Sequence, residues 1–275
     1  MRYQVFKKLL EILIAALEKK HTKGGRNPAL SIEYILLIAL EYWREYRTYA
    51  AIGADFGLDE SNVFRWVRWC ENILMASGEI TLPGKKALLS GGYEIIQIDA
   101  TETHIERPKK GQRNFYSGKK KRHTIKSQIV VDKATKEIIC VKTSEGKRHD
   151  FQLYKDSKLP INKNTKAETD SGYQGIKGIH KNSEHPKKKP PKGELTEAEK
   201  AENRRISRSR ISNEHAIGFL KRFRILSERY RNRRKRFGHR LNLLAAICNR
   251  PLAKLSQSQV LSRCTRSRLQ PVIIL

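Results

Sequence analysis

The chain has 275 residues and carries 57 Lys and Arg against 28 Asp and Glu, a formal net charge of +29. So large an excess of positive charge favours a polyanionic partner, with nucleic acid as the first expectation and an anionic membrane surface as the alternative. No run approaches the roughly 18 apolar residues that a membrane-spanning helix needs. Hydrophobic residues make up 38% of the chain, too many for a disordered protein, and the length suits one large domain or two modest ones.

The N-terminal twenty residues are amphipathic, and Glu11 and Glu18 interrupt them, so they do not resemble a signal peptide. The chain has four scattered cysteines, Cys70, Cys140, Cys248 and Cys264. They form no CxxC pair and have no histidine at metal-ligand spacing, which argues against a zinc site. We therefore expect reduced thiols in a cytosolic protein.

Helices are predicted throughout the first 84 residues. Apolar residues recur at helical spacing over residues 3–20 and again over residues 32–46. Glycines and a proline break the chain between these segments. Ser31 is placed to cap the second helix.

A shorter helical pair follows. Thr48 leads a helix that Gly57 ends, and Ser61 is placed to cap the next helix. Helix, glycine-containing turn and helix over about residues 47–73 is the pattern of a helix-turn-helix. Its second helix would expose three polar residues to the major groove: Asn62, Arg65 and Arg68. A plain three-helix bundle with solvated arginines is the alternative.

The composition changes after Pro83-Gly84, and we expect a domain boundary at about residue 85. Residues 1–84 would form a helical DNA-binding domain, residues 85–250 a second domain, and residues 251–275 an atypical tail. The second domain begins with strand-like segments at residues 93–100, 124–131 and 137–142. Residues 132–136 suit a hairpin turn between the last two, so this half of the sheet should be antiparallel.

Three acids stand out in this second domain. Asp99 follows the apolar run Ile95–Ile98, where a buried strand would end, and an acid there is costly unless it binds something positive. Asp170 follows what looks like a fourth, short strand, and a helix is expected before that strand at about residues 150–157. Glu214 lies on a helix after a Thr196/Glu199 capping box and is predicted to point at whatever that helix packs on.

This order of strands, helices and acids matches a ribonuclease-H-like layout, an α/β (α+β) fold with a mixed sheet flanked by helices. Three converging carboxylates, Asp99, Asp170 and Glu214, would form an oxygen-only site for two Mg²⁺ ions, with Mn²⁺ as a substitute. Asp99 would bridge both ions, and the other two acids would hold one each. Such a pair of ions stabilises the attacking and leaving oxygens of an in-line phosphodiester displacement.

Over roughly residues 28–250 the chain also resembles the DDE transposases of bacterial insertion sequences, kin to the Harbinger-type nucleases. The resemblance rests on spaced blocks at Ile98–Glu102, Gln112–Thr124, Lys147–Phe151, Asp170–Gly175 and Asn213–Phe223. It implies the same catalytic triad and an N-terminal helix-turn-helix that binds terminal inverted repeats. It also implies that Arg210 corresponds to a basic residue of the family's last motif. Asn213 departs from the family, which usually has an apolar residue there.

Two basic groups are expected to contact DNA phosphates. The first precedes the second strand and consists of Lys119, Lys120, Lys121 and Arg122. The second follows the Glu214 helix and consists of Arg231, Arg233, Arg234, Lys235 and Arg236. Solvated surface charge is the alternative for each group.

The favoured function is a transposase that cleaves double-stranded DNA at the ends of its element and joins the freed 3′-hydroxyl to target DNA. Acting on two ends suggests a homodimer or a higher assembly on DNA. The alternative is a non-catalytic DNA-binding protein that keeps the nuclease fold as a scaffold. A ribonuclease or RNA-binding protein is disfavoured, because no aromatic stacking platform for single strands is evident.

Overall fold

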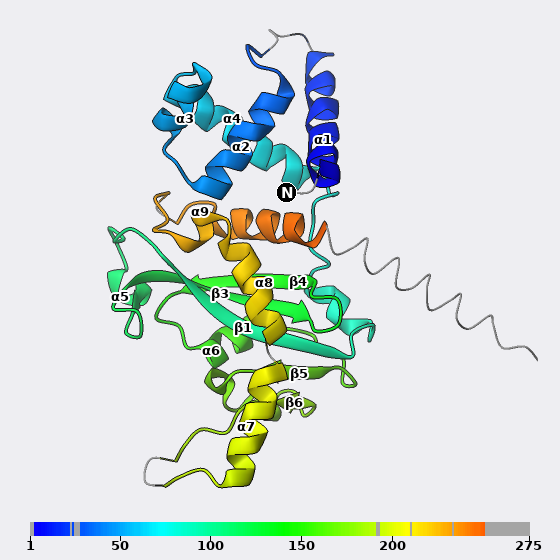
Figure 1. Cartoon of the computed structure of the whole chain (residues 1–275), viewed down its shortest axis with the longest axis vertical. Helices are drawn as coiled ribbons and strands as arrows, with labels where there is room; N and C mark the ends of the chain where they lie inside the picture. Colours follow the sequence, from blue (N-terminus) through cyan, green and yellow to red (C-terminus); the bar gives the residue numbers. More distant parts are fainter. Residues whose placement is uncertain are drawn as a thin grey trace, which may run out of the picture.

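The computed structural model describes residues 3–22, 24, 28–190, 193–209, 211–232 and 234–250. In it, a layer of N-terminal helices lies above a curled mixed sheet with helices on both of its faces (Figure 1). This arrangement confirms the predicted class, an N-terminal helix-turn-helix followed by a mixed α/β fold. The predicted tail, residues 251–275, lies outside the described residues.

The four N-terminal helices are α1 (Tyr3–His21), α2 (Ile32–Glu45), α3 (Tyr49–Phe56) and α4 (Glu60–Ala76). Each was predicted within a few residues of its observed position. α4 packs against α1, α2 and α3, so the helix-turn-helix pair α3–α4 belongs to a larger helical bundle.

Of the three predicted helix caps, Thr48 is confirmed, Ser31 is confirmed in position but not in its hydrogen bond, and Ser61 is wrong. The Thr48 hydroxyl accepts a hydrogen bond of 3.1 Å from the backbone N–H of Ala51, as predicted. Ser31 stands at the N-cap of α2 but makes no capping hydrogen bond. α4 begins at Glu60, so Ser61 already lies in its first turn, and the Asp59 carboxylate accepts from the Ser61 N–H at 2.8 Å.

The rest of the chain alternates strands with helices. In order, the elements are η1 (Lys85–Leu89), β1 (Ile95–His104), α5 (Gln112–Phe115), β2 (Tyr116–Ser117), β3 (Arg122–Asp132), β4 (Ile138–Glu145), α6 (Asp150–Ser157), β5 (Lys166–Thr169), η2 (Ser171–Tyr173), η3 (Ile176–Gly178), β6 (Ser183–Glu184), α7 (Glu197–Ser209), α8 (Ile211–Lys221) and α9 (Arg224–Ser227). A last helix covers residues 237–250.

The sheet has the order β2-β3-β1-β5-β6, and β4 also pairs with β3. β1, β3 and β4 form the predicted antiparallel meander, whereas β5 runs parallel to β1 and β6 parallel to β5. The capping box before α7 is also confirmed, since Thr196 and Glu199 each accept from the other's backbone N–H.

The predicted end of β1 was wrong, and the error matters for the position of Asp99. β1 does not end at Ala100 but continues to His104, because residues 101–104 pair with β3. Asp99 therefore lies inside β1. What ends beside Asp99 is the neighbouring parallel strand, since the last pair of β1 and β5 is Ile98 with Thr169.

Two apolar clusters cover the two faces of the sheet. One lies between the sheet, α6 and η1 and includes Ile96, Ile98 and Tyr154. The other joins the opposite face, through α8 and residues 237–250, to the cores of α1, α2 and α4. The boundary predicted at residue 85 thus falls beside a continuous core and stays a prediction. None of the described helices combines the length and the apolar character that a membrane crossing needs.

Candidate active site and nucleic-acid interface

Asp99 and Asp170 lie next to each other at the place where β5 ends. The parallel pairing of β1 and β5 closes with Ile98 and Thr169, and each acid is the following residue. Asp99 Oδ1 accepts the N–H of Ala100 at 2.7 Å, and Asp170 Oδ1 accepts the N–H of Gly172 at 2.7 Å. Each of these bonds orients its carboxylate with a backbone donor, which is a fixed group.

α8 crosses the sheet on the face that Asp99 occupies. Before α8, the carbonyl of Ser209 accepts a 2.7 Å hydrogen bond from Gln97 Nε2. After α8, the carbonyl of Leu226 accepts a 2.7 Å hydrogen bond from the Thr103 hydroxyl. Gln97, Asp99 and Thr103 share one face of β1 because side chains alternate along a strand. β1 therefore holds the chain on both sides of α8.

Lys221, at the end of α8, lies near Asp99. Burial and the nearby charge of Lys120 lower the pKa of Lys221, and the charge of Asp99 acts in the opposite direction. Such interactions decay with distance, so these three side chains belong to one neighbourhood. Sequence reasoning did not assign Lys221 to the site, since a single lysine at the end of a helix gives no signal of its own.

Glu214 differs from its predicted setting. The prediction that it points at the packing surface of its helix is wrong, because Glu214 is exposed. The residue before it, Asn213, is fully buried, and Ala216, Ile217 and Leu220 are buried as well. Neither polar atom of the Asn213 amide has a hydrogen-bond partner in the described part of the chain. The apolar stripe of α8 is thus shifted by one residue from the predicted stripe, and it includes a polar residue.

The donor chemistry suits a hard divalent cation, because the candidates are carboxylate oxygens. Among the described residues, however, no three His, Cys, Asp or Glu side chains lie close enough together to hold a metal ion. Asp99 and Asp170 are adjacent, and Glu214 extends from a helix packed on the same strand. The convergence of all three acids on one ligand set stays a prediction.

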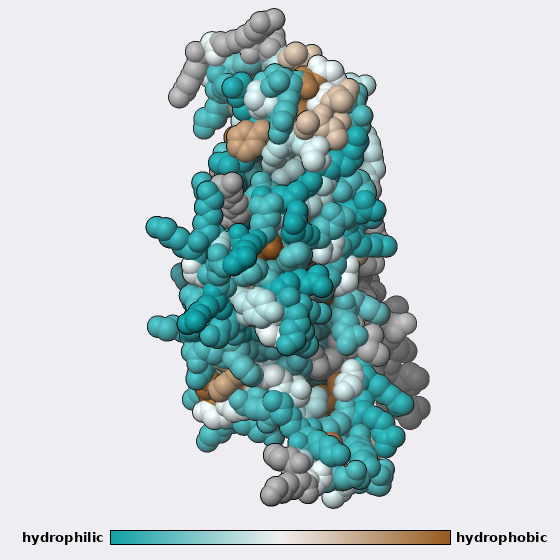
Figure 2. Space-filling model, turned by 90° about the vertical axis from the view of Figure 1, so that its left-hand side faces the viewer, coloured by the Kyte–Doolittle hydropathy of each residue, from teal (hydrophilic) through white to brown (hydrophobic). Residues whose placement is uncertain are grey.

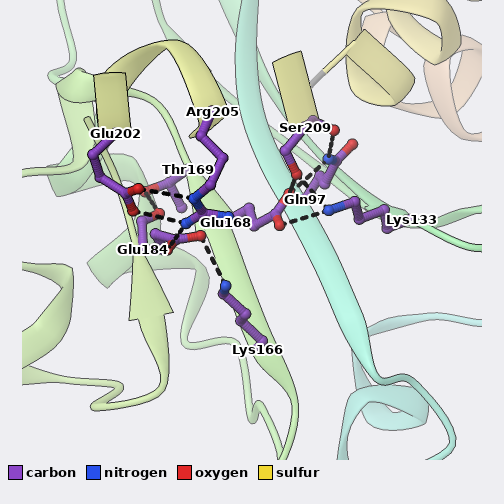
Figure 3. Close-up of polar contacts among 9 residues, drawn as sticks. All are labelled: Gln97, Lys133, Lys166, Glu168, Thr169, Glu184, Glu202, Arg205 and Ser209. Atoms are coloured by element: carbon purple, nitrogen blue, oxygen red, sulfur yellow. Dashed lines mark hydrogen bonds and ion pairs between the residues drawn. The ribbon is translucent and has the colours of Figure 1, made fainter. Parts of the chain in front are cut away.

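A polar cluster, drawn in Figure 3, centres on residues of β1 and β5 that lie two positions before Asp99 and Asp170. Glu168, on β5, is 1% exposed and accepts hydrogen bonds from Gln97 Nε2 at 2.9 Å, Lys133 Nζ at 2.7 Å and Ser209 Oγ at 2.7 Å. Burial acts to raise the pKa of Glu168, but these three hydrogen bonds outweigh it, and the pKa is lowered. We call Gln97, Lys133, Glu168 and Ser209 the clamp.

A separate ion cluster holds the outer part of α7 to the sheet edge, as Figure 3 also shows. Glu184, on β6, pairs with Lys166 at 2.8 Å and with Arg205 of α7. Arg205 pairs in turn with Glu202, one turn earlier on the same helix, at 2.8 Å. This cluster is more exposed than the clamp.

On the other side of Asp170, a lysine is buried among acids. Lys126 is 8% exposed, and its ammonium lies 2.7 Å from Asp150 and 3.7 Å from Glu102. Gly172 separates this group from the site: a Cβ built on it would lie 2.8 Å from Asp150 Oδ2 and 2.9 Å from Asp170 Oδ1. A side chain larger than that of glycine would therefore force one or both carboxylates to shift.

The predicted basic groups divide into exposed and engaged residues. Lys119, Lys120, Lys121 and Arg122 are all exposed around the turn between β2 and β3. Lys235 is exposed, and so is Arg234, whose guanidinium lies 4.3 Å from the ring centroid of Phe115. Arg210 and Arg233 lie outside the described residues.

Arg231 and Arg236 are engaged within the protein. Arg231 donates to the backbone carbonyls of Tyr46 and Arg47 and stacks over the Tyr46 ring. Arg236 pairs with Glu71 at 2.9 Å. These internal partners account for both side chains, so we leave the two residues out of the DNA-binding set that we propose.

The helix that was predicted to expose polar residues to the major groove is α4. Arg65 is exposed, Arg68 is partly exposed, and Asn62 is partly buried and accepts a long 3.4 Å bond from Arg65. Phe64, one residue before Arg65 on the same helix, is 42% exposed and lies under the guanidinium of Arg68. Figure 2 shows the side of the molecule that carries α3, α5 and α9, where the surface is mostly hydrophilic and apolar patches are small.

Comparison with known proteins agrees with both halves of this description. Residues 98–249 match the family model of a DDE superfamily endonuclease, and residues 28–80 match that of the helix-turn-helix of DDE superfamily endonuclease. The chain is 48% identical over 252 residues to the probable transposase for insertion sequence element IS702 from Microchaete diplosiphon. That alignment covers 91% of each chain.

Proposed function

The chain belongs to the DDE superfamily of endonucleases and is an insertion-sequence transposase with a DNA-binding helix-turn-helix. On that premise we propose that it cleaves DNA at the ends of its element and transfers the freed strand. Superfamily members generally use divalent metal ions. The observation that carries the proposal is the placement of Asp99 beside Asp170, with the segment bearing Glu214 held across the same face of β1.

We assign the catalytic roles to the three acids. Asp99, Asp170 and Glu214 would hold two Mg²⁺ ions, with Mn²⁺ as a substitute. When bound, such ions stabilise the attacking and leaving oxygens of an in-line phosphodiester displacement. The backbone N–H groups of Ala100 and Gly172 orient the two strand carboxylates toward this task. Closing the ligand set requires the Glu214 side chain to move toward them.

The proposed DNA-binding surface has two parts. Arg65 and Arg68 of α4, with Asn62 beside them, would enter the major groove of the terminal inverted repeat. The exposed turn of Lys119, Lys120, Lys121 and Arg122, together with Arg234 and Lys235, would contact phosphates near the site. Processing two element ends requires two active sites, so we propose a homodimer or a higher assembly on DNA, acting at the bacterial nucleoid.

The test uses the full-length protein and a labelled duplex that carries the element's own ends, with Mg²⁺, Mn²⁺ or EDTA. The wild type should nick at the element end only with metal. Asp99→Asn, Asp170→Asn and Glu214→Gln should each abolish nicking and retain binding, because the substitutions preserve size and remove the charge that faces the cations. A matched substitution of an acid outside the site, Glu228→Gln on the exposed surface, should nick like the wild type.

Full nicking by Asp99→Asn would overturn the assignment of the acids. A wild-type protein that binds the ends tightly but never nicks in either metal would instead support the alternative function, a DNA-binding scaffold without catalysis.

A further inference from the structure

The clamp connects the three segments that carry the three acids. Gln97 lies two residues before Asp99, and Glu168 lies two residues before Asp170. Ser209 lies five residues before Glu214, at the end of α7. In Figure 3 these side chains meet at one point between the strands and the helix.

Gln97 and Glu168 of the clamp are buried, Lys133 and Ser209 are partly exposed, and their hydrogen bonds support one another. Gln97 is 0% exposed and donates both to Glu168 and to the Ser209 carbonyl, at 2.9 and 2.7 Å. The Ser209 hydroxyl donates to Glu168 at 2.7 Å, and Lys133 from the β3–β4 turn supplies the positive charge that a buried carboxylate needs. Removing the Glu168 charge would leave the Lys133 ammonium without its ion-pair partner.

The clamp also holds the chain just before α8, because Ser209 lies two residues before the first residue of that helix. Outer-shell groups of this kind orient metal ligands, and their loss weakens metal binding even though they never touch the ion. Glu214 is exposed and extends from a short helix, so its distance to the two strand acids depends on where the beginning of α8 is held.

We propose that Glu168, acting through Gln97, Ser209 and Lys133, is a positioning residue that sets the place of Glu214 relative to Asp99 and Asp170. This inference rests on the proposed function, because it presupposes that the three acids share metal ions. The positioning role gives a reason for burying an acid inside the sheet, on β5, which the catalytic roles of the three acids do not explain.

The test maps metal-directed cleavage of the protein itself. Full-length protein is loaded with Fe²⁺ alone and treated with ascorbate and peroxide, and backbone cuts are located by mass spectrometry. The wild type should be cut beside Asp99, Asp170 and Glu214. In Glu168→Gln, cutting beside Glu214 should fall about tenfold relative to cutting beside the two aspartates, and the Mg²⁺ concentration for half-maximal nicking should rise about 10-fold or more.

Two further variants separate positioning from general stability. Ser209→Ala removes the hydroxyl contacts but keeps the ion pair of Glu168 with Lys133, so it should fold and show a smaller change in the same direction. Glu184→Gln removes the acid that holds the outer part of α7 to β6 and should leave the Fe²⁺ cuts and the Mg²⁺ dependence unchanged.

The outcomes are distinguishable. If Glu168→Gln and Ser209→Ala keep the wild-type cutting pattern and Mg²⁺ dependence, even with a lower Tm, the clamp is only structural and the inference fails while the proposed function stands. An equal change in Glu184→Gln also overturns it. A wild-type protein with no cuts beside the acids overturns the proposed function and this inference together.

Discussion

At the scale of single residues, Gly172 is the position where a small change should affect the site most. A methyl group there would force neighbouring side chains to shift, since a Cβ would lie under 3.0 Å from carboxylate oxygens of both Asp150 and Asp170. We expect Gly172→Ala to displace the Asp170 carboxylate and slow element-end nicking about 100-fold, as misplacement by about 1 Å does elsewhere. Single-turnover nicking rates and Tm measure the two effects.

Gly178 provides the matched control for this substitution. It lies in η3, only a few residues further along, and a Cβ built on it meets no atom within 4 Å. Gly178→Ala should therefore keep the wild-type rate and Tm. A Gly172→Ala protein that nicks as fast as Gly178→Ala would show that the Asp170 carboxylate is not under this constraint.

Residues also show where sequence patterns mislead. The helical stripe that was expected to carry Glu214 inward is displaced by one position, and the buried residue is Asn213. Because one residue turns a helix by about 100°, an apolar stripe read over a short segment does not distinguish the two neighbours. Asp99 and Asp170 could be singled out from the sequence because each follows a short strand-like segment, although β1 runs on past Asp99. The clamp could not be found in this way. Its four members come from distant segments and have no common spacing.

At the scale of elements, the two N-cap positions of α2 and α3 form a natural comparison. Thr48 bonds the Ala51 N–H, whereas Ser31 makes no capping bond. We expect Thr48→Ala to lower the free energy of unfolding by about 1 kcal/mol and Thr48→Ser to restore most of it. Ser31→Ala should cost clearly less. Urea unfolding followed by circular dichroism measures all three, and equal losses for Thr48→Ala and Ser31→Ala would contradict this reading of the caps.

Most elements could be predicted from the sequence, because apolar periodicity and turn residues are local signals. α6 was predicted with its observed bounds, and the β3–β4 hairpin was predicted from its turn. The end of β1 could not be, since Thr101–His104 have no apolar run and are held in the strand by pairing with β3. The parallel pairing of β1 with β5 could not be predicted either, since more than sixty residues of chain separate the two strands. Long-range pairing is set by the packing of the whole sheet and leaves no mark at either strand.

At the scale of the whole molecule, a buried ion cluster joins the DNA-binding helices to the catalytic part. Glu71, on α4, is 1% exposed and accepts hydrogen bonds from Arg240 at 2.6 Å, Arg236 at 2.9 Å and Trp43 at 3.2 Å. Arg240 is 2% exposed and also donates to the Tyr230 hydroxyl at 2.9 Å. With the continuous core beneath it, this cluster makes α4 and the helix of residues 237–250 parts of one packed unit.

This ion cluster, which joins α4 to the helix of residues 237–250, leads to a prediction about how the protein unfolds. Glu71→Gln leaves the buried Arg240 guanidinium without its charge partner, and breaking a buried pair in this way costs about 3–5 kcal/mol. We expect the Tm to fall by about 10 °C and the single thermal transition of the wild type to divide, with the helices of residues 3–76 melting first. Differential scanning calorimetry, with tryptophan fluorescence as a probe of Trp43, Trp66 and Trp69, measures both.

Glu45→Gln is the control, because it also removes an acid that connects the two parts. Glu45, on α2, pairs with Arg224 of α9 at 3.2 Å, but both side chains are about half exposed. An exposed pair contributes less than about 1 kcal/mol, so this variant should unfold in one transition near the wild-type Tm. If Glu71→Gln behaves in the same way, the cluster does not join the two parts, and the core alone must hold the DNA-binding helices in place against the sheet.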